Sequence, residues 1–185
     1  MVRTRSRHRD QLLLSLASAL ADYPRASMEQ LAKTVGISRA TLTRHFSTRE
    51  VMIQAISEAA IISAEQAFER ARPHEGVAEQ AIKRLLGELL PIAELYTYAY
   101  HDETDQVVQA RAEPLRESMI ALFQQWQNAG QIRIDSPALW LVESMSALLR
   151  SAATLIRSGR LARHDAIENI FCVFWQGVHK SDLTR

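Results

Sequence analysis

The sequence contains a single cysteine, Cys172, among its 185 residues. One thiol excludes an internal disulfide and a zinc site built from cysteines, so a reducing compartment is expected. Because Cys172 stands between Phe171 and Val173, we expect its thiol to be buried and inert. No apolar run approaches the roughly 20 residues of a membrane-spanning helix, and the basic start lacks the hydrophobic segment of a signal peptide. We therefore expect a cytoplasmic protein without a membrane partner.

Motifs for catalysis and for cofactors are also missing. There is no Gly-rich phosphate loop, no G-x-S-x-G and no H-E-x-x-H. Ser144 and His164 have acidic neighbours, but their spacing assembles no triad. The cluster at His101, Asp102, Glu103 and Asp105 could suggest a metal site, but a solvated loop is the better interpretation. We therefore expect no cofactor, no metal and no enzymatic activity. An all-helical enzyme is the remote alternative, and it would need paired Glu or Glu-x-x-His on facing helices. No Glu-x-x-His occurs in the chain.

Charge is distributed unevenly along the chain. Residues 1–50 hold nine Lys/Arg against four Asp/Glu, a net charge of +5, and the remainder has a net charge of −4. A basic first segment followed by an acidic remainder indicates a nucleic-acid-binding head on a body that does not bind nucleic acid. Residues 1–10 contain four arginines and are predicted to form a disordered arm that adds phosphate contacts.

Residues 27–46, SMEQLAKTVGISRATLTRHF, have the spacing of a helix-turn-helix. Ala32 is small enough for a second helix to cross closely, and Gly36 can adopt the positive φ that the turn needs. Ser27 and Ser38 are the predicted N-caps of the two short helices. Leu42 is predicted to point inward from the second helix.

The outward face of the second helix carries no acidic residue. Its side chains are Arg39, Ala40, Thr41, Thr43, Arg44 and His45. Hydroxyl and guanidinium donors suit phosphates and base edges, and an α-helix fits the major groove of DNA. A solvated helical hairpin is the alternative, but the turn, the missing acids and the basic flanks together favour DNA binding. Ser27, at the start of the first helix, is also predicted to lie near DNA.

The stretch GISRATLTRHFSTREVMIQAI, residues 36–56, resembles the DNA-binding motif of TetR-family transcriptional regulators, G-V-S-x-G-T-L-Y-x-H-F-x-x-K-E-x-L. The matching residues are Gly36, Ser38, Thr41, Leu42, His45, Phe46 and Glu50. Ala40 replaces the usual Gly, Thr43 the usual Tyr, and Arg49 the usual Lys. The resemblance implies phosphate contacts at four positions: Thr41, Thr43, His45 and Arg49. It is specific over residues 12–58, and beyond them it depends on length and helical pattern.

Helical periodicity continues to the end of the chain, so the predicted fold is all-α. We expect a three-helix DNA-binding head over residues 1–47 and a helical ligand-binding and dimerisation body over 48–185. Thr48–Arg72 is predicted as one long helix that links the two. Pro91 should interrupt the next helix, and Pro114 should begin another. Two more helices, from about Ser136 to Arg157 and from about His164 to His179, complete the predicted body.

Aromatic and sulfur-containing side chains gather in the middle of the chain, where a small, mostly apolar effector could bind. The predicted lining residues are Phe68, Tyr96, Tyr100, Met119, Phe123, Trp126, Trp140 and Arg150. A solid aromatic core without a cavity is the alternative for this group. Arg150 interrupts an apolar helix and must be paired, face water or meet an anionic ligand.

The last two helices are apolar over more than one stripe, which indicates either a central position in the core or pairing with another subunit. The resemblance implies a homodimer through these helices. Trp140 and Trp175 are candidate anchors that could equally belong to the core. The predicted function is a DNA-binding transcriptional regulator, a repressor released by a small molecule from an approximately palindromic operator on double-stranded DNA. The alternative is a DNA binder without a ligand response.

Overall fold

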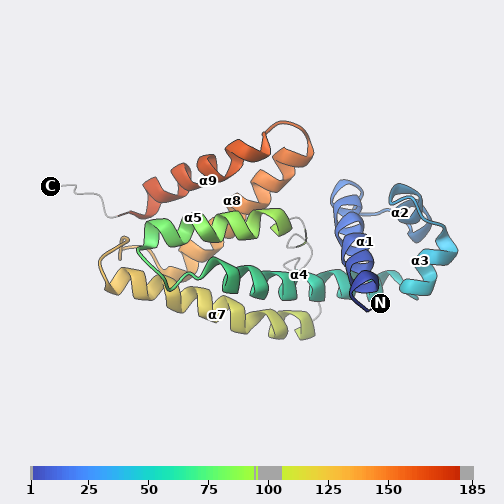
Figure 1. Ribbon diagram of the computed structural model, residues 1–185, viewed down its shortest axis with the longest axis horizontal. Helices are drawn as coiled ribbons and strands as arrows, with labels where there is room; N and C mark the ends of the chain where they lie inside the picture. Colours follow the sequence, from blue (N-terminus) through green and yellow to red (C-terminus); the bar gives the residue numbers. More distant parts are fainter. Residues whose placement is uncertain (1, 94, 96–105, 180–185) are drawn as a thin grey trace. The chain divides into compact units, whose positions relative to one another are not determined.

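The computed structural model describes residues 2–93, 95 and 106–179, with side chains from His8 onward. Within these ranges the secondary structure is entirely helical, as predicted (Figure 1). The helices are α1 (Val2–Asp22), α2 (Met28–Thr34), α3 (Arg39–His45), α4 (Arg49–Ala71), α5 (Ala78–Leu89), the 3-10 turn η1 (Leu90–Ile92), α7 (Gln106–Asn128), α8 (Ala138–Arg157) and α9 (Arg163–Val178). The predicted effector residues Tyr96 and Tyr100 and the acidic cluster at 101–105 lie outside the described residues.

The chain divides into two compact units. The first comprises residues 1–63 and 94–111, and the second comprises residues 64–93 and 112–185. We call the helices of residues 2–63 the head and the second unit the body. Helix α4 contributes residues to both units. The predicted boundary after residue 47 remains a prediction.

Helix α1 begins at Val2, so the prediction of a disordered arm over residues 1–10 is wrong. The segment contains no Gly or Pro to stop a helix, and arginine is a good helix former. In the C-terminal half of α1, Leu16 and Leu20 are buried, and their packing stabilises the whole helix. The helix ends at Asp22, since Pro24 disfavours helical conformation at the residue before it.

The helix-turn-helix forms as the sequence predicts. The Ser27 hydroxyl accepts a hydrogen bond from the backbone N–H of Gln30, and the Gln30 side-chain oxygen accepts one from the backbone N–H of Ser27. This reciprocal pair is a capping box. Gly36 has a φ of +77° in the turn, and Ser38 caps α3. The core of the head consists of fully buried side chains: Leu16, Leu20, Leu31, Leu42, Phe46, Met52 and Ile56.

Helix α4 begins after Thr48, whose hydroxyl accepts the Val51 amide at 3.3 Å. It ends where Arg72 and Gly76 adopt φ values of +44° and +80°, close to the predicted limit. Arg84 of α5 donates hydrogen bonds to the carbonyls of residues 71, 72 and 75. The Ala71 carbonyl is one of the acceptors that the end of a helix leaves without a partner, and the other two belong to the turn that follows, so Arg84 joins the C-terminus of α4 to this turn.

Pro91 changes the α-helix into a 3-10 turn, as predicted, but Pro114 does not begin a helix. Helix α7 starts at Gln106 and contains Pro114 in its interior. An interior proline costs about 3 kcal/mol through a lost hydrogen bond and a clash. Val108 and Ala112, in the turns before Pro114, are buried, and this packing offsets the cost.

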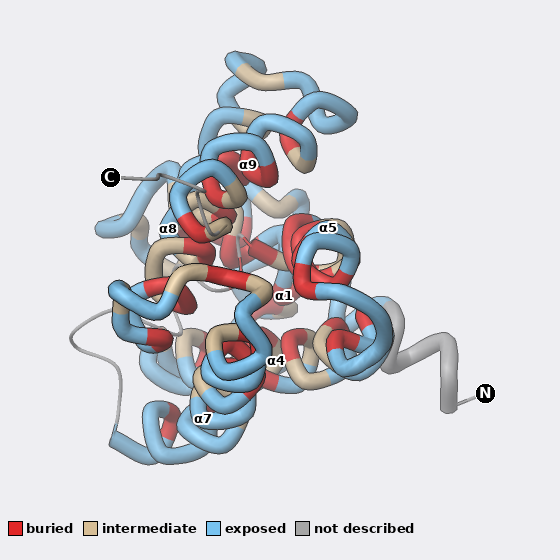
Figure 2. The backbone as a smooth tube through the Cα atoms, turned by 90° about the vertical axis from the view of Figure 1, so that its left-hand side faces the viewer, coloured by how far each residue is buried: buried red, intermediate tan, exposed pale blue. Residues whose placement is uncertain are grey.

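Helices α8 and α9 pack against each other and bury one face each; Figure 2 shows buried and exposed positions alternating along them. Cys172 is exposed on α9, so the prediction of a buried thiol is wrong. Phe171 and Phe174 turn inward instead.

Helix α8 is long and apolar enough to cross a membrane by length and composition, a property that a packed helix of a soluble bundle shares. Leu139, Trp140 and Leu155 of α8 are exposed.

Candidate nucleic-acid interface

Helix α3 presents a polar face because Leu42, and Phe46 at its C-cap, are buried in the core of the head. Leu42 and Phe46 are 0% and 1% exposed. The opposite face exposes five predicted DNA-binding residues: Arg39, Ala40, Thr43, Arg44 and His45. Thr41, a sixth, is half-buried. The face is therefore basic and rich in hydrogen-bond donors, as direct contact with DNA requires.

Two of the predicted contact residues have their side chains oriented by neighbours. The hydroxyls of Thr41 and Ser38 lie 2.9 Å apart, so Thr41 is held at the first turn of α3. Arg39 lies 3.7 Å from Glu29 of α2, and both side chains are largely exposed. An exposed pair of this kind contributes at most about 1 kcal/mol, so Arg39 can exchange Glu29 for a phosphate.

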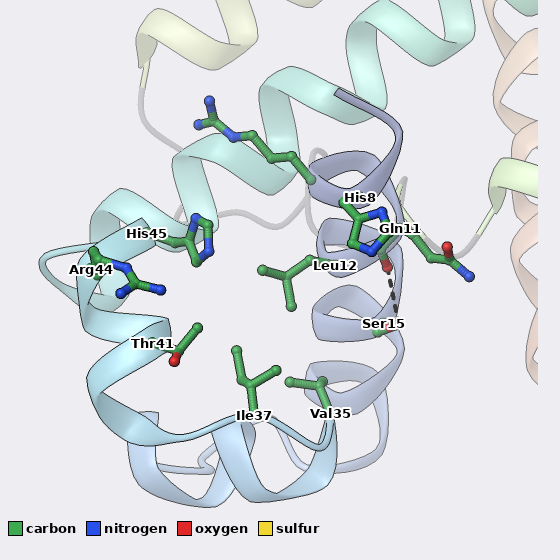
Figure 3. Close-up of a pocket in the computed structure, with 10 residues that line it drawn as sticks. His8, Gln11, Leu12, Ser15, Val35, Ile37, Thr41, Arg44 and His45 are labelled. Atoms are coloured by element: carbon green, nitrogen blue, oxygen red, sulfur yellow. Dashed lines mark hydrogen bonds between the residues drawn. The ribbon is translucent and has the colours of Figure 1, made fainter. Parts of the chain in front are cut away.

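An open groove of about 1080 Å³ lies between α1 and α3 (Figure 3). Its floor is apolar, with Leu12 from α1 and Ile37 from the turn. His8 and Arg9 of α1 line one side, and Thr41, Arg44 and His45 of α3 line the other. Figure 3 shows Arg44 and His45 facing α1 across the groove. The basic side chains of α1 therefore extend the hydrogen-bond donor surface of α3. The sequence indicates this contribution only through the arginines of its first ten residues.

Arg49 is half-buried and its guanidinium is directed toward the loop before α2. Its Nη1 donates to the carbonyl of Ala26 at 3.0 Å and its Nη2 to the carbonyl of Pro24 at 2.5 Å. Both acceptors belong to the loop between α1 and α2, which ends at the N-cap Ser27. The sequence pattern places Arg49 among the phosphate contacts but carries no signal for this long-range hydrogen bonding.

Glu50, the acidic residue of the matched motif, accepts hydrogen bonds in the first turn of α4. Hydrogen bonds from its own backbone amide and from Thr48, together with the charge of Arg49, hold the pKa of its carboxyl below the usual value. A carboxylate at a helix N-terminus is stabilised by the helix dipole. Glu50 is therefore a structural residue of the α3–α4 junction.

The predicted effector residues separate into different environments. Met119, Phe123 and Trp126 are buried along α7. The ring of Phe123 lies 5.0 Å from that of Trp126 and 6.2 Å from that of Phe174, edge to face. This packing fits the alternative of an aromatic core as well as it fits a pocket wall.

The other described effector candidates are more accessible. Phe68 and Arg150 are partly exposed, and Trp140 is 65% exposed at the start of α8. Sequence reasoning missed Ser57 of α4, which is fully buried and whose hydroxyl has no hydrogen-bond partner among the described residues. A polar residue inside the apolar stripe of α4 is the signal that could have identified it.

The capped helix-turn-helix, the basic outward face of α3 and the basic groove beside it define a helix-turn-helix protein of the DNA-binding class. Residues 18–56 match the family model described as bacterial regulatory proteins, tetR family. Over these residues, the head is similar to the DNA-binding part of TetR-family transcriptional regulators.

Similarity to individual proteins extends over nearly the whole chain. The chain is 27% identical over 175 residues to the HTH-type transcriptional regulator NfxB of Pseudomonas aeruginosa, covering 92% of this chain and 94% of that protein. It is 23% identical over 177 residues to the HTH-type transcriptional repressor LfrR of Mycolicibacterium smegmatis, covering 94% and 92%. A crystal structure of LfrR from Mycobacterium smegmatis in complex with proflavine matches with a TM-score of 0.69 and 20% identity, covering 93% of this chain and 98% of that one. The chain therefore shares the fold of this LfrR structure.

Proposed function

We propose that this regulator is a repressor that binds an approximately palindromic operator through α3 and is released by a small-molecule effector. The observation that carries the proposal is the outward face of α3, where Arg39, Thr43 and Arg44 are exposed and no acidic residue is present. A helix with this surface can enter the major groove, with phosphate contacts from its ends and its neighbours.

Repression is supported by the name of one relative, LfrR, which is a transcriptional repressor. An effector is supported by the complex of LfrR with proflavine, a planar aromatic cation. The body of this chain has aromatic side chains in α7 that could pack against such a ring system. A DNA binder without a ligand response is the second candidate, and the packed rings of Phe123, Trp126 and Phe174 favour it.

A homodimer is part of the proposal. Helices α8 and α9 expose apolar side chains, among them Leu139, Trp140 and Val173, and exposed apolar surface of this kind marks interaction sites. Two heads related by a two-fold axis would read two half-sites about one helical turn apart, or somewhat more.

Binding is tested by fluorescence anisotropy with fragments of the DNA that flanks the gene of this protein, at several salt concentrations. The wild-type protein is expected to bind one fragment more tightly than random duplex of the same length. Arg44→Ala is expected to weaken binding to all sequences if Arg44 contacts a phosphate, and to reduce the slope of log affinity against log salt by about one ion.

A suitable control is Arg160→Ala, because Arg160 is exposed in the turn between α8 and α9 and lies outside the head. This variant should bind DNA like the wild type. If the wild-type protein binds no fragment even at low salt, the proposed function is wrong.

A further inference from the structure

We infer that Arg49 is a positioning residue of the DNA-binding head, which holds the loop before α2 in place, and that it makes no phosphate contact. The inference rests on the proposed DNA-binding function and concerns how the same interface is organised. It departs from the phosphate contact that the motif implies for this position.

The first observation is where the guanidinium donors go. Nη1 and Nη2 of Arg49 donate to two backbone carbonyls, those of Ala26 and Pro24. Arg49 is half-buried, whereas Arg39 and Arg44 on α3 are exposed. One N–H of each terminal nitrogen is therefore engaged by the backbone of the loop before α2, and these two hydrogen bonds fix the direction of the guanidinium.

The second observation is the chemistry of the residue. The matched motif has Lys where this chain has Arg49. The planar guanidinium has several donors in a fixed fork and can join two acceptors at once, whereas a lysine ammonium is a compact point charge on a flexible stem. The bridge between two carbonyls thus depends on the residue that distinguishes this chain from the usual motif.

The third observation is what the loop controls. Ala26 directly precedes Ser27, the N-cap of α2, and the Ala26 amide donates to the Tyr23 carbonyl at 3.0 Å. Ser27 is itself a predicted DNA-binding residue. Because Arg49 is the first residue of α4, its two hydrogen bonds fix the start of α2 relative to the start of α4. Helix α2 packs against α3, and the start of α4 follows α3 in the chain.

The test compares Arg49→Ala and Arg49→Lys with Arg44→Ala in the full-length protein, using the tightest-binding fragment over a range of salt concentrations. Arg49→Ala is expected to weaken binding about tenfold at every salt concentration while the salt slope stays at the wild-type value. Arg49→Lys is expected to bind as weakly as Arg49→Ala, since it restores the charge and not the bridge. Arg44→Ala should show the smaller slope of a lost phosphate contact.

Hydrogen exchange measured without DNA directly separates a positioning role of Arg49 from a phosphate contact. Arg49→Ala and Arg49→Lys should both accelerate exchange of the amides of residues 26–31, whereas Arg44→Ala should leave them unchanged. If Arg49→Ala does not fold, Arg49→Lys alone decides. Because exchange needs no DNA, it still tests the bridge if the protein binds no operator.

Three results would overturn the inference. The first is a salt slope that falls by about one ion in Arg49→Ala and is restored in Arg49→Lys, which identifies a phosphate contact. The second is wild-type affinity in Arg49→Ala. The third is unchanged exchange of residues 26–31 in both Arg49 variants.

Discussion

At the scale of single residues, the helix-turn-helix is specified by a few positions with clear mechanical roles. Gly36 adopts a φ of +77°, and Ser27 and Ser38 cap the helices on either side of the turn. Each of these features depends on residues no more than four positions apart. This locality explains why the motif could be predicted from the sequence and why the structure confirms it.

Gly36→Ala is expected to destabilise the head by about 1–2 kcal/mol, because a non-glycine residue at this φ is strained. A Cβ at this position would meet no atom within 4 Å, so the backbone conformation alone is responsible. The free energy of unfolding, measured by urea denaturation, checks the prediction.

The matched control is Gly87→Ala. Gly87 lies inside α5, and a Cβ there also meets no atom within 4 Å. Alanine is expected to stabilise this helix by about 0.5–1 kcal/mol. Changes of the same sign in both variants would contradict the explanation.

At the scale of elements, α4 is hydrogen-bonded through arginine side chains at both ends. Arg49 donates from its first residue to the loop before α2. Arg84 donates from α5 to carbonyls at its other end, that of Ala71 at 2.8 Å and that of Arg72 at 2.9 Å. The ends of this helix are therefore positioned by specific hydrogen bonds in addition to its buried stripe.

Arg84→Lys is expected to lower the free energy of unfolding of the body by about 1–3 kcal/mol, because a lysine cannot satisfy the several carbonyls that the guanidinium joins and hydrogen bonds to charged groups contribute this much. Urea denaturation checks it. The control is Arg160→Lys, on the exposed turn between α8 and α9, which should change stability by less than about 0.5 kcal/mol. Equal effects in the two variants would show that the Arg84 hydrogen bonds contribute nothing.

At the scale of the whole molecule, the exposed apolar side chains of α8 and α9 bear on assembly. Trp140 is 65% and Val173 is 61% exposed. Phe171, in contrast, is 6% exposed, and the Nζ atom of Lys83 lies 4.2 Å from the centre of the Phe171 ring. A charge at Phe171 would therefore disturb the core of the body, while charges at Trp140 or Val173 would disturb only the proposed dimer interface.

The double variant Trp140→Glu, Val173→Glu is expected to be a folded monomer at micromolar concentration, where the wild type is expected to be a dimer. Buried unpaired carboxylates at an interface are strongly unfavourable. Light scattering measures the mass, and circular dichroism verifies the helical content. Gln124→Glu, at an exposed position of α7, is the control and should leave the mass unchanged. A monomeric wild type, or a double variant that remains dimeric, would exclude this interface.

The proposed effector response is tested with proflavine as the first probe. Proflavine is expected to raise the melting temperature of the free protein and to weaken its binding to the operator. A coupling of about 1–3 kcal/mol corresponds to a 5- to 150-fold loss of affinity. Because planar aromatic cations also intercalate into DNA, an unrelated DNA-binding protein on its own duplex must be titrated in parallel.

If neither proflavine nor other lipophilic aromatic compounds stabilise the protein and release the operator, the chain is a DNA binder without a ligand response.

The sequence by itself determined the helices, the caps and the turn of the DNA-binding motif, because these follow from spacings of three or four residues and from the conformational preferences of Gly, Ser and Pro. Only the tertiary structure decided the direction of Arg49, whose acceptors stand 23 and 25 residues earlier in the chain. It also decided that α7 continues through Pro114 and that Cys172 is exposed. These outcomes depend on packing partners far away in the sequence, and such partners leave no local pattern.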